Sequence, residues 1–211
     1  NFAAKKKLIR ESPHKLKRPP KPAPKDRWLD DDEIRRFLAA TRSTPHLHVA
    51  VVLMLSTAGR KGAVLELTWD RIDFEARTID LRTVRDPYAK KRAFVPMNSG
   101  TYALLSQWKP RCVSEYVVEY QQKGMKDIKK SFAAAAKRAG LEDVTPHVWR
   151  HTAAVHMVKN GCSMARVSQY LGHSSLLVTE GTYARFAPGH LKQEAEAVDF
   201  LDAKDAVLGE S

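Results

Sequence analysis

The stretch TPHVWRHTAAVHMVKNG, residues 145–161, decides the local fold and raises the question of function. Its apolar residues recur at helical spacing and a glycine ends the pattern, so the stretch predicts a helix. His147 and Arg150 stand three positions apart and therefore share one face of that helix. An imidazole and a guanidinium one turn apart can serve a ligand or a reaction, but His147 can also be a helix-start residue after Pro146 and Arg150 a surface charge, so the rest of the chain has to decide.

Composition limits the class of protein. The chain has 211 residues, of which 43% are apolar and 28% charged, as expected for one globular domain or for a domain plus a tail. Its longest apolar run, 49–55, is far shorter than the roughly 20 residues of a membrane span, and no signal-peptide pattern opens the chain. Cys112 and Cys162 form no CxxC pair, which argues against a disulfide scaffold and a zinc site. We therefore expect a soluble, cytoplasmic protein.

Positive charge is concentrated at the N-terminus. Residues 1–27 hold ten lysine or arginine residues against two acidic ones, a net charge of +8 in a chain whose total is +12. Five prolines in the same segment predict an extended chain without regular structure. A basic, extended arm suits a polyphosphate backbone, because release of condensed counterions drives such binding. A solvated interdomain linker is the compatible alternative.

The rest of the chain predicts a mixed, mainly α fold with a small antiparallel β-sheet. Asp30 or Asp31 can cap a first helix, a largely apolar helix spans about 45–57, and near-alternation in 71–84 and 93–97 predicts the strands. EYVVEY, residues 115–120, fits either a helix or a strand. Further helices are predicted after Asn98 and over 126–140, 146–160, 163–171, 175–185 and 188–202.

Two classes of protein explain a basic, helix-rich chain of this kind. One is a non-catalytic DNA-binding module, because residues 163–186 are typical of two short helices around a glycine turn. The other is an enzyme that acts on the phosphodiester backbone. Without a metal, such an enzyme needs bidentate arginines for the non-bridging oxygens, a nucleophile that holds the phosphate, and an acid for the leaving 5′ oxygen.

The sequence offers a candidate for each of these roles. They are Arg60, Lys90 or Lys91, His147, Arg150, His173 and Tyr183. Taken alone, Arg60 at the end of the apolar helix fits a surface cation beside the helix dipole. Tyr170 falls in an apolar helical pattern and is expected in the core, whereas Tyr183 has more polar neighbours. We expect structural roles for His151 and His156 and no metal, because the Glu of an H-E-x-x-H site is absent.

Four segments resemble, in order and spacing, the sequence boxes of the tyrosine recombinases, or phage-type integrases. TAGRKGAVLELTWDRID (57–73) looks like the first arginine box and TPHVWRHTAAVHMVKNG like the H-x-x-R box. YLGHSS (170–175) looks like the Leu-Gly-His box and GTYARFAPGHL (181–191) like the nucleophile segment. The resemblance implies a catalytic domain over 28–211, with residues 1–27 as a basic, Pro-rich linker and the tail of a missing core-binding domain.

The resemblance also implies what each candidate does. Arg60 and Arg150 would clamp the scissile phosphate, His147 would assist proton transfer, His173 would hydrogen-bond the phosphate, and Tyr183 would attack to give a 3′-phosphotyrosine. The family's lysine lies in a turn before a strand, where DPYAKKRAFVPMN (86–98) offers two lysines, and we favour Lys90. Ala63 stands where the family usually has an acidic residue, so a carboxylate that orients the arginine must come from elsewhere or be lost.

The expected protein is thus a site-specific recombinase that cleaves and rejoins DNA strands without ATP, metal or other cofactor. Its expected partners are duplex DNA and other protomers of itself in a tetrameric synapse, with no membrane and no small-molecule substrate. A type IB topoisomerase would need the same kinds of catalytic residue and is one alternative. The non-catalytic helix-turn-helix module is the other.

Overall fold

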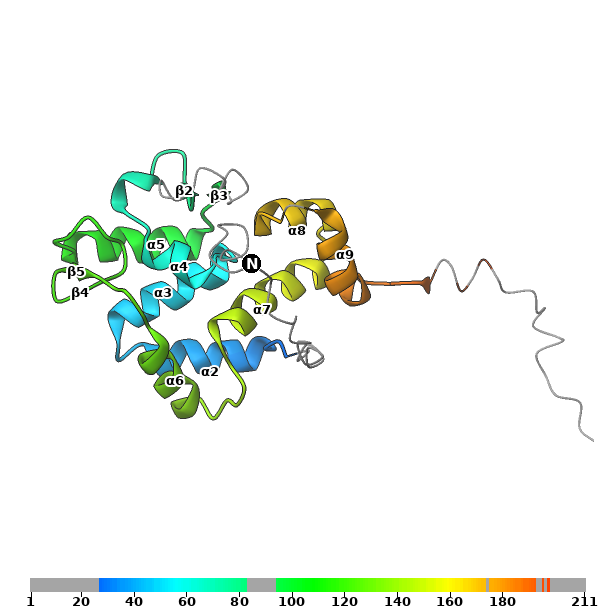
Figure 1. Cartoon of the computed structure of the whole chain (residues 1–211), viewed down its shortest axis with the longest axis horizontal. Coiled ribbons are helices and arrows are strands. Elements are labelled where there is room, and N and C mark those ends of the chain that lie inside the picture. The colour runs from blue at the N-terminus through cyan, green and yellow to red at the C-terminus, as the bar shows by residue number, and fades with distance from the viewer. Residues whose placement is uncertain (1–26, 83–93, 174, 193–194, 196, 198–211) are drawn as a thin grey trace, which may run out of the picture.

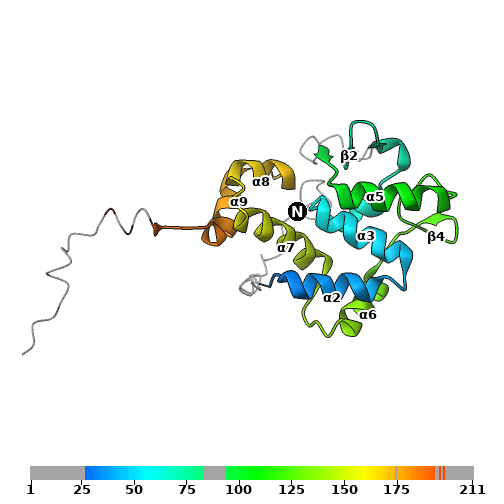
Figure 2. The same cartoon turned by 180° about the vertical axis from the view of Figure 1, so that it is seen from behind.

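Most of the regular secondary structure in the described residues is helical, with two small sheets toward one end (Figures 1 and 2). The computed structural model describes residues 27–82, 94–173, 175–192, 195 and 197. Its α-helices are α2 (Asp31–Thr41), α3 (Pro45–Ser56), α4 (Lys61–Leu65), α5 (Ser99–Trp108), α6 (Lys129–Arg138), α7 (Pro146–Lys159), α8 (Met164–Leu171) and α9 (Leu176–Tyr183). The strands are β1 (Ile72–Asp73), β2 (Thr78–Asp80), β3 (Phe94–Pro96), β4 (Glu119–Tyr120) and β5 (Lys123–Gly124).

The core is built around α3, which contacts α2, α4, α5 and α7. Its near-continuous apolar sequence leaves almost no polar face, so the helix must be covered on most sides. Trp149 of α7 is fully buried against it and donates from Nε1 to the Val51 carbonyl at 2.8 Å. The rings of Phe37 and Phe132 pack on the same indole. Each such aromatic side chain contributes roughly 1.5–3 kcal/mol by leaving water, so these three rings fix α2, α6 and α7 together.

Local sequence accounts for the ends of the helices. The Asp30 side chain accepts a hydrogen bond from the Glu33 N–H, and the Glu33 side chain accepts one from the Asp30 N–H. This capping box starts α2. Asn98 caps α5, and Thr145 caps α7 before a proline at its first position. Gly172 ends α8 in the left-handed region at φ 62°, which places the next residue, His173, beyond the helix.

The larger sheet has the order β1-β2-β3 with antiparallel pairing throughout. Ile79 faces Ile72 on one side and Val95 on the other, and all three side chains are buried. The ambiguous EYVVEY segment contains β4, which pairs with β5 in a two-stranded sheet. The prediction of a mainly α fold with a small antiparallel sheet is therefore confirmed.

Two predicted helix boundaries are wrong. The apolar helix α3 ends at Ser56, and Ala58 then adopts φ 47°, so Arg60 does not end that helix but stands at the N-cap of α4. At the C-terminus the predicted helix does not begin at Pro188, because Gly189 at φ 67° and Leu191 at φ 58° turn the chain, although Lys192 and Ala195 farther on are helical. Most of the predicted 188–202 helix lies outside the described residues, as does the 1–26 leader. Within the described part, no helix is long and apolar enough to cross a membrane.

Candidate active site

Arg60, His147 and Arg150 line one pocket of about 410 Å³ between α4, α6 and α7. His147 and Arg150 come from successive turns of α7, and Arg60 reaches the pocket from the N-cap of α4. A Cβ on the preceding Gly59 would lie 2.8 Å from Thr57 Oγ1 and 2.9 Å from Val64 Cγ2, so only glycine fits this turn. The turn thus holds one arginine beside the other, in spite of their like charge.

The Arg150 side chain is buried and fixed by backbone carbonyls. Its Nη1 donates to the Ala58 carbonyl and its Nη2 donates to the Leu171 carbonyl at 2.6 Å. Burial, followed by the nearby Arg60 charge, lowers the pKa of Arg150 to about 10, and the Tyr183 phenol opposes this shift. The guanidinium is therefore still charged at neutral pH, and it is positioned before any ligand arrives.

Ala63 lies near Arg150 as well as Arg60, and the contacts of Arg150 show what orients that guanidinium. This alanine is buried and lines a small pocket together with Arg60 and Arg150. Among the described residues, the hydrogen-bond partners of the Arg150 guanidinium are two carbonyl oxygens and no carboxylate. Carbonyl dipoles orient the arginine here without neutralising it, so its full positive charge remains for an anionic ligand.

His173 follows the turn that ends α8 and is held by α9. Its Nδ1 lies 2.9 Å from the Thr179 hydroxyl, and Thr179 is fully buried. Burial, and then the charges of Arg150 and Arg60, lower the pKa of His173. The imidazole is therefore neutral near pH 7, and both arginines are close enough for their charge to reach it.

Tyr183 lies at the end of α9 with 6% of its surface exposed. Its ring packs on His151 with centroids 5.1 Å apart. Burial raises the pKa of Tyr183, and the Arg150 charge lowers it. The phenol is thus protonated at neutral pH, and the cation that would stabilise its phenolate is the arginine of the pocket.

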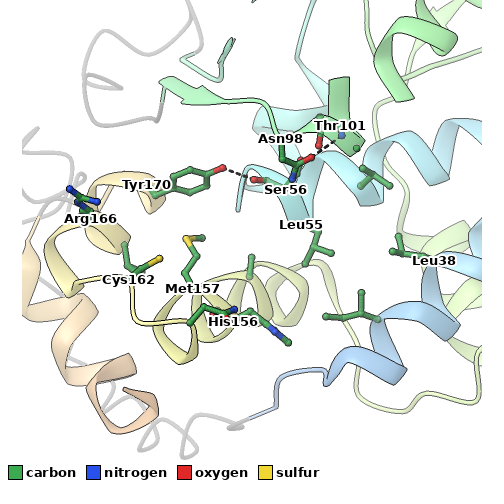
Figure 3. Close-up of a pocket in the computed structure, with 16 residues that line it drawn as sticks. Leu38, Leu55, Ser56, Asn98, Thr101, His156, Met157, Cys162, Arg166 and Tyr170 are labelled. Atoms are coloured by element: carbon green, nitrogen blue, oxygen red, sulfur yellow. Dashed lines mark hydrogen bonds between the residues drawn. The ribbon is translucent and has the colours of Figure 1, made fainter. Parts of the chain in front are cut away.

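Tyr170, the competing tyrosine, has a different environment. Its hydroxyl donates to the Ser56 carbonyl at 2.6 Å, as the dashed line in Figure 3 shows. The ring lines a larger, mainly apolar cleft of about 710 Å³, and it also lines the small pocket that contains Arg60, Ala63 and Arg150, where its hydroxyl is already committed to the Ser56 carbonyl. We place the chemistry in the pocket of about 410 Å³ that Arg60, His147 and Arg150 line, because a phosphate needs cations rather than an apolar wall.

Other candidate residues are not part of this pocket or are not described by the structure. The predicted lysines Lys90 and Lys91 lie outside the described residues. His156 binds the Leu29 carbonyl at 2.8 Å and packs edge-on against Trp28. In the described part of the chain, no group of three His, Cys, Asp or Glu side chains converges as a metal site would require.

Sequence reasoning missed two features of the site. Thr179 precedes Tyr183 by one helical turn, and this spacing is the only sequence signal that ties it to the nucleophile segment. Lys61 and Lys129 line the same pocket as the arginines although they are far apart in the chain. No periodicity in the sequence brings those two lysines together.

Known proteins resemble this chain over most of its length. The sequence model of the phage integrase family matches residues 27–190. Tyrosine recombinase XerA of Thermococcus onnurineus is 28% identical over 203 residues, which cover 91% of this chain and 70% of that protein. The integrase of Salmonella phage P22 is 27% identical over 199 residues, 85% of this chain and 50% of that protein.

Solved structures give the same result. The catalytic domain of bacteriophage HP1 integrase aligns with a TM-score of 0.61 at 28% identity, over 86% of this chain and 99% of that domain. The Tn1549 transposon integrase, solved with a circular intermediate DNA, has a TM-score of 0.70 at 19% identity, over 93% of this chain and 74% of that one.

The chain belongs to the phage integrase family. Its function is site-specific DNA recombination, and it is an enzyme that cleaves and rejoins DNA through a tyrosine. The predictions of family, fold class and reaction are confirmed. Which residues perform the reaction remains a prediction.

Proposed function

We propose that Arg60, His147, Arg150, His173 and Tyr183 form the active centre that cleaves and rejoins DNA. One observation carries this proposal: two arginines and a histidine line one pocket, and the Arg150 charge also reaches His173 and Tyr183. The position of Arg60 adds support. A cation at a helix N-cap gains nothing from the helix dipole, so a ligand explains its place better than local stability does.

The two guanidinium groups bind the non-bridging oxygens of the scissile phosphate. A phosphodiester repels a nucleophile by its own charge, and cations aimed at those oxygens remove that barrier. Arg150 can do this without reorganisation because two carbonyls already fix its fork. Arg60 is exposed and closes on the phosphate from the other helix.

The Tyr183 oxygen then attacks phosphorus. A bond forms from the phenolic oxygen to phosphorus, the bond from phosphorus to the 5′ oxygen breaks, and a 3′-phosphotyrosine remains on the strand. His147 accepts or relays the phenolic proton, and an acid returns a proton to the 5′ oxygen, a role that we assign to Lys90 on the sequence pattern alone. Attack by a partner strand's 5′ hydroxyl reverses these steps and needs no ATP.

His173 donates from Nε2 to a phosphate oxygen. A neutral imidazole has one N–H, so a hydroxyl that donates to Nδ1 favours the tautomer that carries the proton on Nε2. The Thr179 hydroxyl lies at the distance required to donate to Nδ1. The lowered pKa of His173 keeps the ring neutral, which makes the tautomer depend on this one contact.

DNA and other protomers are the partners of this enzyme class: solved relatives include a recombinase on its DNA site and a λ integrase tetramer on a Holliday junction. We propose that this protein also assembles as a tetramer on DNA, in the cytoplasm. Residues 28–211 would be the catalytic domain. The basic residues 1–27 would serve as a linker that follows the DNA backbone.

Tyr183→Phe tests the proposal. The ring keeps its shape and its packing on His151, so the variant should fold and bind a pool of nicked random-sequence duplexes while forming no covalent adduct on a denaturing gel. Tyr170→Phe is the matched control: it loses one hydrogen bond to Ser56 and should still form the adduct. An adduct with Tyr183→Phe, or its loss only with Tyr170→Phe, contradicts the assignment.

A further inference from the structure

Two lysines extend the cationic lining of the active-site pocket. Lys61 is the first residue of α4, directly after Arg60, and Lys129 is the first residue of α6. Both line the pocket that contains Arg60, His147 and Arg150. The reaction as derived above needs two cations on the scissile phosphate and uses neither lysine.

An anionic group of the protein lies among these cations. Oδ1 of Asp127 accepts from the Lys61 ammonium at 2.6 Å and from the backbone N–H groups of Ile128 and Lys129 at 2.9 and 3.2 Å. The hydrogen bond from Lys61 is the main cause that lowers the pKa of Asp127. One carboxylate oxygen therefore occupies a position with three donors, which suits any singly charged oxyanion.

This ion pair is exposed and easily replaced. The side chains of Lys61 and Asp127 are 38% and 52% exposed. Exposed ion pairs of this kind are weak, because water and salt compete for both partners. A phosphate that reached Lys61 would have little to displace.

DNA bound at the arginines must bring a phosphate near this position. One strand carries a charged phosphate at every nucleotide, so a strand whose scissile phosphate lies between Arg60 and Arg150 presents further phosphates on either side. Lys61 follows Arg60 directly in the sequence. Among the described residues that line the pocket, the lysines available for such a neighbour are Lys61, once it leaves Asp127, and Lys129.

We propose that Lys61 and Lys129 form a second phosphate site, which binds the backbone phosphate next to the scissile one, and that Asp127 occupies this site in the free protein. The inference rests on the proposed function, because it takes the arginine pair as the place of the scissile phosphate. DNA binding then exchanges the Asp127 carboxylate for a phosphate. The carboxylate repels DNA that does not displace it and so opposes loose, unspecific contacts.

The competing account is purely structural. Asp127 would then serve as a cap for α6 and as a tie from α6 to α4, and binding of DNA would leave the Lys61 pair intact. The two accounts make opposite predictions for Asp127→Asn. Asparagine keeps an oxygen that accepts from the two N–H groups, so α6 should still start normally, but it no longer holds the lysine by charge.

The first experiment measures the affinity of the full chain for a fluorescein-labelled duplex by anisotropy. The affinity of Asp127→Asn for the duplex should exceed that of Asp32→Asn roughly two- to fivefold, because an exposed ion pair contributes a factor of that size. Asp32 is a matched control, since it is an exposed carboxylate paired with Arg36 on α2. The excess should vanish in a Lys61→Ala background. An excess that is absent, or that persists without Lys61, overturns the proposal.

The second experiment follows binding against salt and does not depend on Asp127. Lys61→Ala and Lys129→Ala should each reduce the slope of log K against log salt by about 0.9, the value of one phosphate contact. Lys137→Ala, in the last turn of the same helix α6, should leave the slope nearly unchanged. Equal slopes for the Lys61 variant and the wild type overturn the proposal.

The second phosphate site and the proposed function can fail independently of each other. If Tyr183→Phe abolishes the adduct while Lys61→Ala leaves the salt slope unchanged, only the second phosphate site fails. If Tyr183→Phe still forms the adduct, the catalytic assignment fails, whatever the lysine variants show.

Discussion

The Nη2 group of Arg150 donates to the carbonyl oxygen of Leu171 at 2.6 Å, and this bond links α7 to the end of α8, two segments of the proposed active centre. Leu171 is the last residue of α8, and His173 follows two residues later. The other nitrogen of the fork binds Ala58, in the turn that carries Arg60. One side chain therefore sets the positions of the other arginine and of the histidine.

Arg150→Lys should lose both stability and activity. A lysine keeps the charge but cannot donate to both carbonyls in a fork, and each buried acceptor left without a partner costs roughly 1–3 kcal/mol. Urea unfolding should show that loss, and adduct formation should fall by at least about 10². Arg60→Lys should lose activity alone, because Arg60 is exposed. Similar unfolding midpoints for the two variants would contradict this division of roles.

Thr179→Val should slow cleavage without unfolding the protein. Valine fills the same buried volume but removes the hydroxyl at 2.9 Å from His173 Nδ1, so the ring loses its fixed tautomer. We expect a loss of about 10- to 100-fold in the rate of adduct formation at saturating DNA, with little change in affinity. Thr179→Ser should restore the rate. Thr182→Val, on the exposed side of the same helix, should have no effect, and an equal loss there would refute the positioning role.

Much of this site follows from the sequence, and the exceptions have physical reasons. Asn98 and Gly172 mark helix ends because a cap and a left-handed residue are local requirements, and the structure uses both as predicted. The N-cap position of Arg60 was missed because α4 has only five residues, too few for a periodic pattern. Likewise β4 has only two residues, and its strand conformation depends on pairing with β5 rather than on its own sequence.

Chemistry that depends on distant contacts is the part that sequence does not reveal. The carbonyl of Leu171 as an arginine partner leaves no trace in residue type, because every residue has a carbonyl. The same holds for the two lysines of the further phosphate site, which come from α4 and α6. By contrast, the four boxes could be predicted, because each is continuous in the chain.

Stability should fall on acidification in a window below about pH 6.5, the ordinary pKa of histidine. Burial and two arginines lower the pKa of His173 in the folded state, so the unfolded chain binds more protons there and stability rises with pH across the window. His173→Gln should therefore reduce the difference in urea midpoint between about pH 7.5 and about pH 5.5. The difference should not vanish, because burial also lowers the pKa of His46 and His48. An unchanged difference would refute the assigned shift.

The basic leader should add affinity but no chemistry. Removing residues 1–26 takes away nine lysine and arginine residues and keeps Arg27, which pairs with Glu33 at 2.6 Å. Each side chain that contacts a phosphate contributes about 0.9 to the salt slope, so the shortened chain should bind duplex DNA with a flatter slope. Once DNA is saturating, its rate of adduct formation should match that of the full chain. An unchanged slope would show that the segment acts only as a linker.

Lys90 should prove to be the acid that protonates the leaving 5′ oxygen, whereas Lys91 contacts the backbone. The sequence pattern puts both lysines in the turn before β3, whose first residue is Phe94, and a lysine in such a turn can reach forward into a cleft while strand residues alternate faces. The two neighbours should therefore differ in role. Loss of a positioned acid costs about 10²–10⁴ in rate, while loss of a phosphate contact mainly weakens binding. A substrate with sulfur in place of the bridging 5′ oxygen has a leaving group that needs no proton.

Lys90→Ala should therefore cleave the sulfur substrate at a nearly normal rate and ordinary DNA slowly, as measured by single-turnover adduct formation on matched nicked duplexes. Lys91→Ala should treat the two substrates alike, because it lacks a contact rather than a proton donor. Rescue of Lys91→Ala instead would mean that the register of the turn is shifted by one residue. If sulfur rescues neither variant, the acid is another group, and His147, which lines the pocket with both arginines, is the next residue to replace.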